Sequence, residues 1–208
     1  MKTQLYTKCK VYDFEKLFKE KGYAYFNKGN YNLNIIGIRT NQGNKVTNKY
    51  DDYLIVIYNT ELGWKRQIYS ITTEPGLKFM KKPSNIKGTA ILAPGQYRGT
   101  YKIDKHRGKY DALCQRNKIV KVYRDNNRDM IYDYKPETID KGMFGINIHR
   151  SNEFWTNTTV DGYSAGCQVF ADPKEFNSFM SIVKKAANIW GNCFTYTLIN
   201  EEDLNNEL

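Results

Sequence analysis

The sequence predicts a mostly β protein, a β-rich α+β fold with a short N-terminal helix and one C-terminal covering helix. Short runs of apolar or alternating residues recur along the chain, which is typical of strands. The 17 tyrosines also suit strands, because a tyrosine ring packs while its hydroxyl stays wet. One long amphipathic segment near the C-terminus predicts the covering helix.

The chain is expected to form one main domain. Its 208 residues contain no internal repeat and no low-complexity linker. We predict an N-terminal helical appendage over residues 1–30, the main domain over 31–200 and a loose acidic tail over 201–208.

The expected strands are bounded by turn residues. The continuous apolar run 54–57 predicts a strand buried on both faces, and residues 77–88 are expected to be irregular. The predicted strands span 33–39, 51–59, 64–73, 89–97, 99–103, 111–116, 118–124 and 193–200, with two more on either side of the loop 151–163.

Two helices carry recognisable end signals. Asp13 can cap a short helix over 13–21, and Asp172 can cap a long one over 172–191. Gly191 then provides a stop signal. The apolar positions of the long segment fall on one helical face, so it is expected to cover the sheet.

The net charge of +10 favours anionic partners such as nucleic acid, anionic lipid or an anionic wall polymer. The lysines and arginines are spread along the chain, however, and no nucleic-acid-binding signature is present. A solvated basic surface is therefore the favoured interpretation, and no nucleic-acid partner is expected.

The four cysteines have no C-x-x-C spacing, which argues against a zinc ribbon and a thioredoxin-like site. At this chain length they are expected to be reduced thiols. The N-terminus lacks the apolar core of a secretion signal, and no apolar window reaches the length of a membrane span. Neither a signal peptide nor a membrane span is expected.

The strongest candidate site lies within residues 145–170. An alternating segment predicts a strand that ends at His149, followed by the polar loop 151–163. Residues 164–167 then form a tight turn that places Cys167 at the start of a second strand. Two such strand ends can bring an imidazole beside a thiol.

That pairing supports nucleophilic chemistry. The imidazole of His149 can take the thiol proton, and it is expected to lower the pKa of Cys167. Backbone N–H groups of the turn can face a developing oxyanion, and each such donor stabilises the transition state by roughly 3–4 kcal/mol. The alternative is a small core cysteine and a hydrogen-bonded polar histidine without chemistry.

A histidine, a loop and Ser-x-Gly-Cys at this separation resemble the catalytic signature of the L,D-transpeptidase domain, with the likeness covering residues 30–200. Residues 125–179 are similar to a branch of that family common in bacteriophage and prophage genomes. The resemblance implies a β-sandwich or barrel and a cysteine acyl-transfer site for peptidoglycan stem peptides. It also implies a thioester intermediate. Attack by an amine converts that thioester to a cross-link, and attack by water hydrolyses it.

The resemblance assigns roles to the site. Cys167 is the nucleophile, His149 the general base and Arg150 the third member, through its carbonyl or its side chain. The oxyanion donors are the N–H groups of Ala165, Gly166 and Cys167, and Ser164 shapes the turn.

Two positions depart from the family pattern. Ala165 stands where relatives usually have histidine, and Val169 stands where they usually have arginine or asparagine. The loss of that polar partner weakens the case for binding the stem carboxylate. It therefore favours hydrolysis, or an altered substrate, over cross-linking.

His106, Tyr110 and Tyr163 are candidate substrate contacts, although His106 also fits an exposed loop. Two other functions remain open. The chain can be a non-catalytic virion or wall-binding component that keeps the fold. It can also be a zinc-dependent amidase that uses His106, His149 and Cys167 as ligands.

Asp125, Asn127, Asp129 and Asp133 occupy positions 1, 3, 5 and 9 of a candidate calcium loop. Its sixth and twelfth positions lack the usual glycine and glutamate, so an Asx-rich turn is favoured. No cofactor is expected. The partners implied are stem peptides and other virion proteins, and the location is a phage virion or the host cytoplasm with release to the wall.

Overall fold

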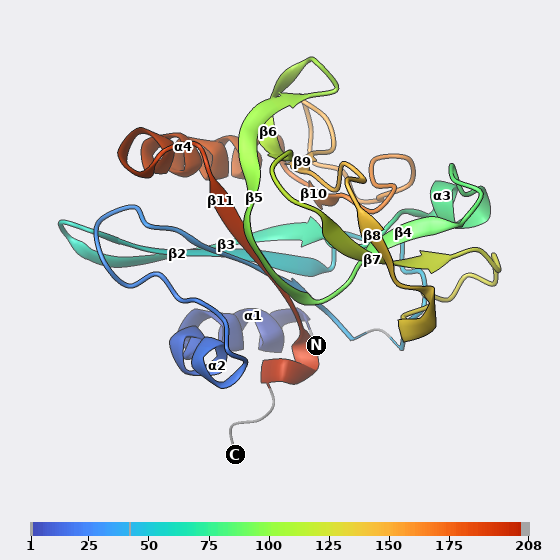
Figure 1. The fold of residues 1–208 in the computed structure, drawn as a ribbon, viewed down its shortest axis with the longest axis horizontal. Helices are drawn as coiled ribbons and strands as arrows, with labels where there is room; N and C mark the ends of the chain where they lie inside the picture. The colour runs from blue at the N-terminus through green and yellow to red at the C-terminus, as the bar shows by residue number, and fades with distance from the viewer. Residues whose placement is uncertain (1, 42, 205–208) are drawn as a thin grey trace.

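A computed structural model describes residues 2–41 and 43–204 of the chain (Figure 1). Strands make up 36% and helices 22%, which confirms the predicted mostly β class. Eight strands close into a barrel in the order β1-β11-β5-β6-β9-β10-β3-β2. The barrel strands are β1 (Asn34–Arg39), β2 (Asp52–Thr60), β3 (Gly63–Thr72), β5 (Gly95–His106), β6 (Tyr110–Gln115), β9 (Ile148–Arg150), β10 (Gln168–Phe170) and β11 (Phe194–Asn200).

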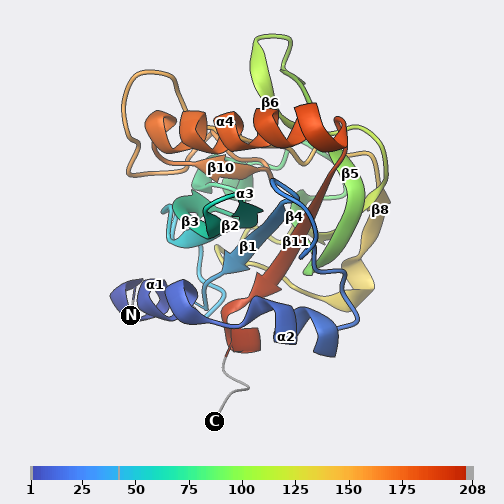
Figure 2. The same cartoon turned by 90° about the vertical axis from the view of Figure 1, so that its left-hand side faces the viewer.

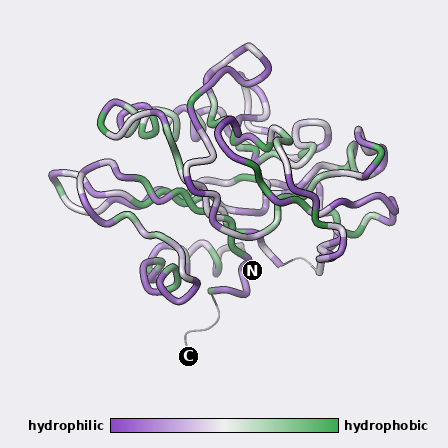
Figure 3. Tube along the Cα trace, in the orientation of Figure 1, coloured by the Kyte–Doolittle hydropathy of each residue, from purple (hydrophilic) through white to green (hydrophobic). Residues whose placement is uncertain are grey.

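A second, three-stranded sheet lies beside the barrel, at the right of Figure 1. It consists of β4 (Thr89–Leu92), β7 (Val120–Asp125) and β8 (Asp140–Gly142). The apolar stretches follow the strands in the middle of the molecule, and the loops at its periphery are largely hydrophilic (Figure 3). The molecule therefore buries its apolar residues between layers.

Helix α4 (Pro173–Trp190) covers one side of the barrel. The side chain of Asp172 accepts a hydrogen bond from the Lys174 N–H, and Gly191 follows the helix with a φ of +86°. Phe176, Phe179 and Val183 are buried in the main hydrophobic cluster with the strands. The predicted covering helix is thus confirmed, because its apolar face meets the barrel.

Helices α1 (Lys2–Val11) and α2 (Phe14–Glu20) pack on the opposite side of the strands, so that the barrel lies between two helical layers (Figure 2). Phe14 and Phe18 share a second hydrophobic cluster with Ile36 and Ile55. The segment predicted as an appendage therefore forms part of a core. Helix α1 was not expected, because its sequence shows little apolar periodicity.

Some sequence predictions need correction. Residues 77–88, expected to be irregular, contain helix α3 (Leu77–Lys81). The tail was expected to be loose, but Glu201–Leu204 forms a 3₁₀ helix with Leu204 fully buried. Residues 205–208 of the predicted tail lie outside the described residues. Among residues 2–41 and 43–204, the helices are too short or too polar to cross a bilayer.

Candidate active site

His149 and Cys167 lie on neighbouring parallel strands. In the register of β9 and β10, Ile148 pairs with Gln168 and His149 pairs with Val169. Cys167 directly precedes β10 and packs with Val169 in one small hydrophobic cluster, so it shares the face of His149. One strand spacing across and two residues along separate the two Cα atoms by roughly 8 Å. The fold therefore brings the two predicted residues to the same face.

The sulfur of Cys167 rests against the backbone that leads into β9. The thiol donates to the Gly145 carbonyl oxygen at 3.4 Å, and the Asn147 N–H donates to Sγ at 3.4 Å. Within the described residues the imidazole is not among its hydrogen-bond partners, so the expected direct His–Cys bond is not formed at rest. Catalytic hydrogen bonds often tighten only when substrate binds.

His149 is held by its own chain. Its Nδ1 lies 2.8 Å from the Arg150 carbonyl oxygen, and the side chain is only 4% exposed. A carbonyl oxygen can only accept, so Nδ1 carries the proton and Nε2 has a free lone pair. The Tyr110 hydroxyl donates to the same carbonyl at 3.1 Å. This tautomer suits a general base.

His106 lies directly against His149. The two rings stack with centroids 4.0 Å apart and planes inclined by 22°. The Asn147 side-chain amide donates to His106 Nδ1 at 3.1 Å, and its oxygen accepts from the Gln115 N–H at 2.9 Å. His106 is buried, so its sequence-based interpretation as an exposed loop residue is wrong. The stack fixes the position of the His149 ring.

The stacked rings of His106 and His149 argue against the zinc-dependent alternative. Imidazoles that ligate one metal direct their nitrogen lone pairs at a common point, whereas these rings lie face to face. In the part of the chain that the structure describes, no group of three His, Cys, Asp or Glu side chains is placed to hold a metal ion.

Burial controls the protonation of the site. It lowers the pKa of His149 to about 3, an effect strengthened by His106 and opposed by the bond to the Arg150 carbonyl. Burial likewise lowers the pKa of His106 to about 4. It raises the pKa of the Cys167 thiol, opposite to the lowering expected from the sequence. A neutral imidazole beside a neutral thiol is the resting state at pH 7.

The turn before Cys167 is closed by one hydroxyl. Ser164 Oγ donates to the Cys167 carbonyl at 2.8 Å and accepts from the Gly166 N–H at 3.1 Å. The Gly166 N–H is therefore engaged and is not available as an oxyanion donor. The N–H groups of Ala165 and Cys167 have no hydrogen-bond partner among the described residues, so they remain as candidate donors.

Arg150, the predicted third catalytic member, and Tyr163, a predicted substrate contact, are placed differently. The Arg150 guanidinium lies 4.3 Å from the centre of the Tyr110 ring and pairs with Glu153 at 3.2 Å, so only its carbonyl bonds His149. Tyr163 is 36% exposed at the end of the loop 151–163, and no hydrogen bond links it to the rest of the site within the described chain.

The candidate calcium loop is an Asx-rich turn in this structure. The Asp125 carboxylate accepts from the Asp133 N–H at 3.0 Å, and the Asn127 amide donates to both Asp129 and Asp133. Lys135 pairs with Asp133 at 2.9 Å. The oxygens that would face a cation are occupied by donors of the same hairpin.

Sequence reasoning missed Asn147 and Arg107 as site residues. Asn147 bonds the sulfur through its N–H and His106 through its side chain. Its place two residues before His149 in the alternating segment, which puts it on the same side of the chain, was the available signal. The positive charge of Arg107 lowers the pKa of His106, His149 and Cys167. It lies at the β5–β6 turn, far from Cys167 in sequence, so no local pattern indicated it.

Comparison with protein-family models, curated proteins and solved structures finds no significant match to this chain. The grounds for a function are therefore the geometry of the site and the resemblance of the His149–Cys167 motif.

Proposed function

We propose that this protein is a cysteine-dependent acyl-transfer enzyme that acts on peptidoglycan stem peptides. One observation carries the proposal. The 2.8 Å bond between His149 Nδ1 and the Arg150 carbonyl leaves Nε2 as a proton acceptor on the face shared with Cys167.

The first half-reaction starts from the neutral pair. Cys167 Sγ attacks the carbonyl carbon of the third stem residue while His149 Nε2 takes the thiol proton. The N–H groups of Ala165 and Cys167 stabilise the oxyanion. As the intermediate collapses, the C–N bond breaks, His149 returns the proton to the leaving amine, and D-alanine departs from a thioester on Cys167.

The second half-reaction regenerates the thiol. Water attacks the thioester carbonyl with His149 as base, the C–S bond breaks, and the sulfur recovers the proton. Val169 favours water over an amine acceptor. Its side chain is fully buried among Tyr50, Val160 and Ala171, at the position where the L,D-transpeptidase family that the motif resembles usually has arginine or asparagine. The proposed activity is therefore hydrolytic, an L,D-carboxypeptidase or endopeptidase, and we infer a phage-encoded role in wall processing.

The test is digestion of purified muropeptides followed by mass spectrometry. The wild type and Cys193→Ala, an exposed-cysteine control, should both remove one D-alanine. Cys167→Ala should lose activity by at least ~10³-fold while keeping its fold. Products unchanged by Cys167→Ala, or no product from folded wild type, would contradict the proposal.

A non-catalytic wall-binding role is the second candidate. It is favoured by the net charge of +10 and by the resting thiol, whose hydrogen bonds are to the backbone. In that case folded wild type leaves muropeptides intact but sediments with cell walls, and Cys167→Ala sediments equally well.

A further inference from the structure

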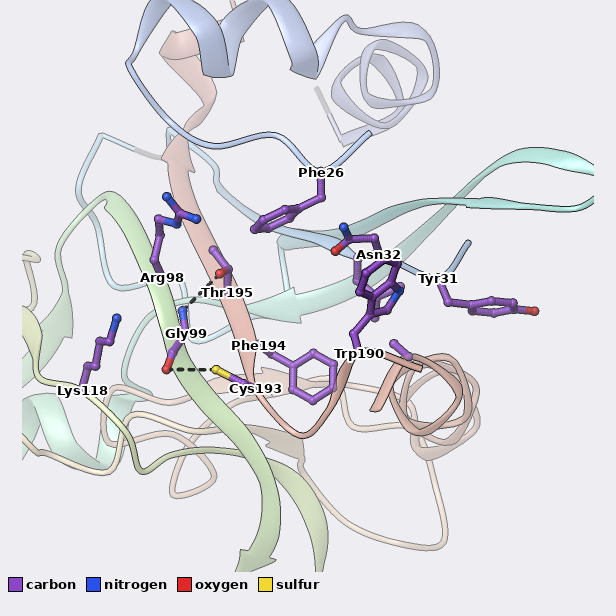
Figure 4. Close-up of a pocket in the computed structure, with 12 residues that line it drawn as sticks. Phe26, Tyr31, Asn32, Arg98, Gly99, Lys118, Trp190, Cys193, Phe194 and Thr195 are labelled. Atoms are coloured by element: carbon purple, nitrogen blue, oxygen red, sulfur yellow. Dashed lines mark hydrogen bonds between the residues drawn. The ribbon is translucent and has the colours of Figure 1, made fainter. Parts of the chain in front are cut away.

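A cavity lies apart from Cys167, where four segments of the chain meet. It has a volume of about 450 Å³ and is bounded by residues 26–33, by β5 near Gly99, by Lys118 between β6 and β7, and by the junction of α4 with β11 (Figure 4). That volume suits a small ligand of one or two rings. Its lining contains two cations and no acidic side chain.

One side of the cavity is aromatic. Phe26 from the segment before β1, Trp190 from α4 and Phe194 from β11 lie at the centre and right of centre in Figure 4. Trp190 is 51% exposed, yet its indole N–H donates to the Asn30 carbonyl at 2.9 Å. Its ring also lies so close to Gly29 that a Cβ there would approach it to 2.5 Å. The ring is therefore fixed while half its surface stays open.

The other side is cationic. Arg98 and Lys118 both lie near Gly99, on the left of Figure 4. Both are exposed, and neither has a carboxylate partner among the described residues, whereas nearby Arg116 pairs with Asp104 at 2.7 Å. Two unneutralised cations beside a cavity without acids favour an anionic ligand.

The end of α4 orients such a ligand. The C-terminal end of a helix carries partial negative charge, so an anion is disfavoured beside Trp190 and favoured on the Arg98 side. The neutral part of the ligand then lies over the indole ring. Asn32 lines the cavity and its amide donates to the Lys28 carbonyl, which leaves its oxygen to accept from a hydroxyl.

We infer that this cavity binds a phosphorylated sugar, with the sugar ring against Trp190 and the phosphate between Arg98 and Lys118. The sugar supplies an apolar C–H face for the indole and hydroxyls for Asn32. The source we propose is a phosphodiester-linked wall polymer, and that choice alone rests on the proposed function. The net charge of +10 suits the same polyanion.

Calorimetry with N-acetylglucosamine 1-phosphate tests the cavity in a Cys167→Ala background, which removes turnover. The double variant Arg98→Gln/Lys118→Gln should weaken binding by at least ~10-fold, because two charged contacts to phosphate are lost. Lys65→Gln/Lys81→Gln, which removes the same charge from exposed positions elsewhere, should bind as the parent does. Trp190→Ala should also weaken binding.

Three results would overturn the inference: no binding to the parent, equal loss in both double variants, or tighter binding of uridine monophosphate than of the sugar phosphate. A sedimentation assay tests the source. The Cys167→Ala protein should bind intact walls better than walls stripped of phosphodiester polymer, and equal binding would exclude the polymer. Sugar-phosphate binding without muropeptide cleavage would refute the proposed function and leave the cavity assignment standing.

Discussion

The His149 imidazole is oriented by a carbonyl oxygen rather than by a carboxylate. A carbonyl fixes the tautomer at Nδ1 but adds no negative charge that would compensate the burial of an imidazolium. The stacked His106 ring makes the charged form still less favourable. The pKa of His149 therefore stays low, and a preformed thiolate–imidazolium pair is not the resting state.

This residue-scale argument predicts the reactivity of the thiols. With iodoacetamide at pH 7, Cys167 should alkylate slowly, because burial raises its pKa, and its rate should rise only above the ordinary cysteine range. Cys193, which is exposed, should be modified first. Peptide mapping after timed alkylation measures both sites. Fast, pH-independent modification of Cys167 between pH 5 and 8 would indicate an ion pair and contradict this account.

At the scale of elements, the site depends on the short parallel pair of β9 and β10. Alternation and small residues predicted a strand ending at His149, the turn 164–167 and a second strand after Cys167. The structure shifts the first strand, since β9 starts at Ile148 and ends at Arg150. The sequence could not predict the register of the two strands, because each strand has three residues and a long loop joins them. The stacking of His106 on His149 could not be predicted either, since the β5–β6 hairpin that carries His106 lies about forty positions earlier in the chain.

The turn at Gly166 predicts a sharp mutational effect. Gly166 has a φ of +121°, and an added Cβ would lie 2.3 Å from the Ala90 carbonyl oxygen. Gly166→Ala should therefore lower the free energy of unfolding by more than ~2 kcal/mol and abolish activity. Gly43→Ala is the control, since Gly43 also has positive φ but open space around it, and it should cost about 1 kcal/mol. Urea denaturation compares them, and equal costs would contradict the close contact.

At the scale of the whole molecule, the predictions succeeded where a segment carries its own sequence signals and failed where packing orders the segment. Helix α4 was predictable because its own sequence carries both end signals and a clear apolar face. Helix α1 and Glu201–Leu204 were not, because they are ordered by packing on the barrel rather than by local pattern. Leu204 and Phe14 both belong to the second hydrophobic cluster although they are far apart in sequence.

The buried histidines predict how global stability changes with pH. In the folded state the pKa values of His149 and His106 are about 3 and about 4, below the unfolded value of about 6.5. Between pH 4 and 6.5 these two histidines bind more protons in the unfolded chain than in the folded protein, so their contribution to the free energy of unfolding falls as the pH falls through that window. Buried Glu74, whose pKa is raised to about 8, acts in the opposite direction, so the histidine contribution is isolated by comparison with a variant.

The variant His106→Asn should flatten this slope, because it removes one of the two groups and keeps an acceptor for the Asn147 amide. Urea denaturation of wild type and variant at pH 4.5, 5.5 and 6.5 gives both slopes. The contributions of the carboxyl groups are shared by the two proteins and cancel in the comparison. Identical slopes would mean that His106 is not held neutral by burial.

The proposed thioester on Cys167 is open to direct observation. Wild-type protein mixed with a stem tetrapeptide substrate, quenched in acid and digested, should carry the tripeptide acyl group on the peptide that contains Cys167, and hydroxylamine should release it. His149→Asn should reduce its formation by at least ~10²-fold, since proton transfer to Nε2 is lost. An acyl group on another residue, or D-alanine release with no adduct on Cys167 at any quench time, would contradict the mechanism.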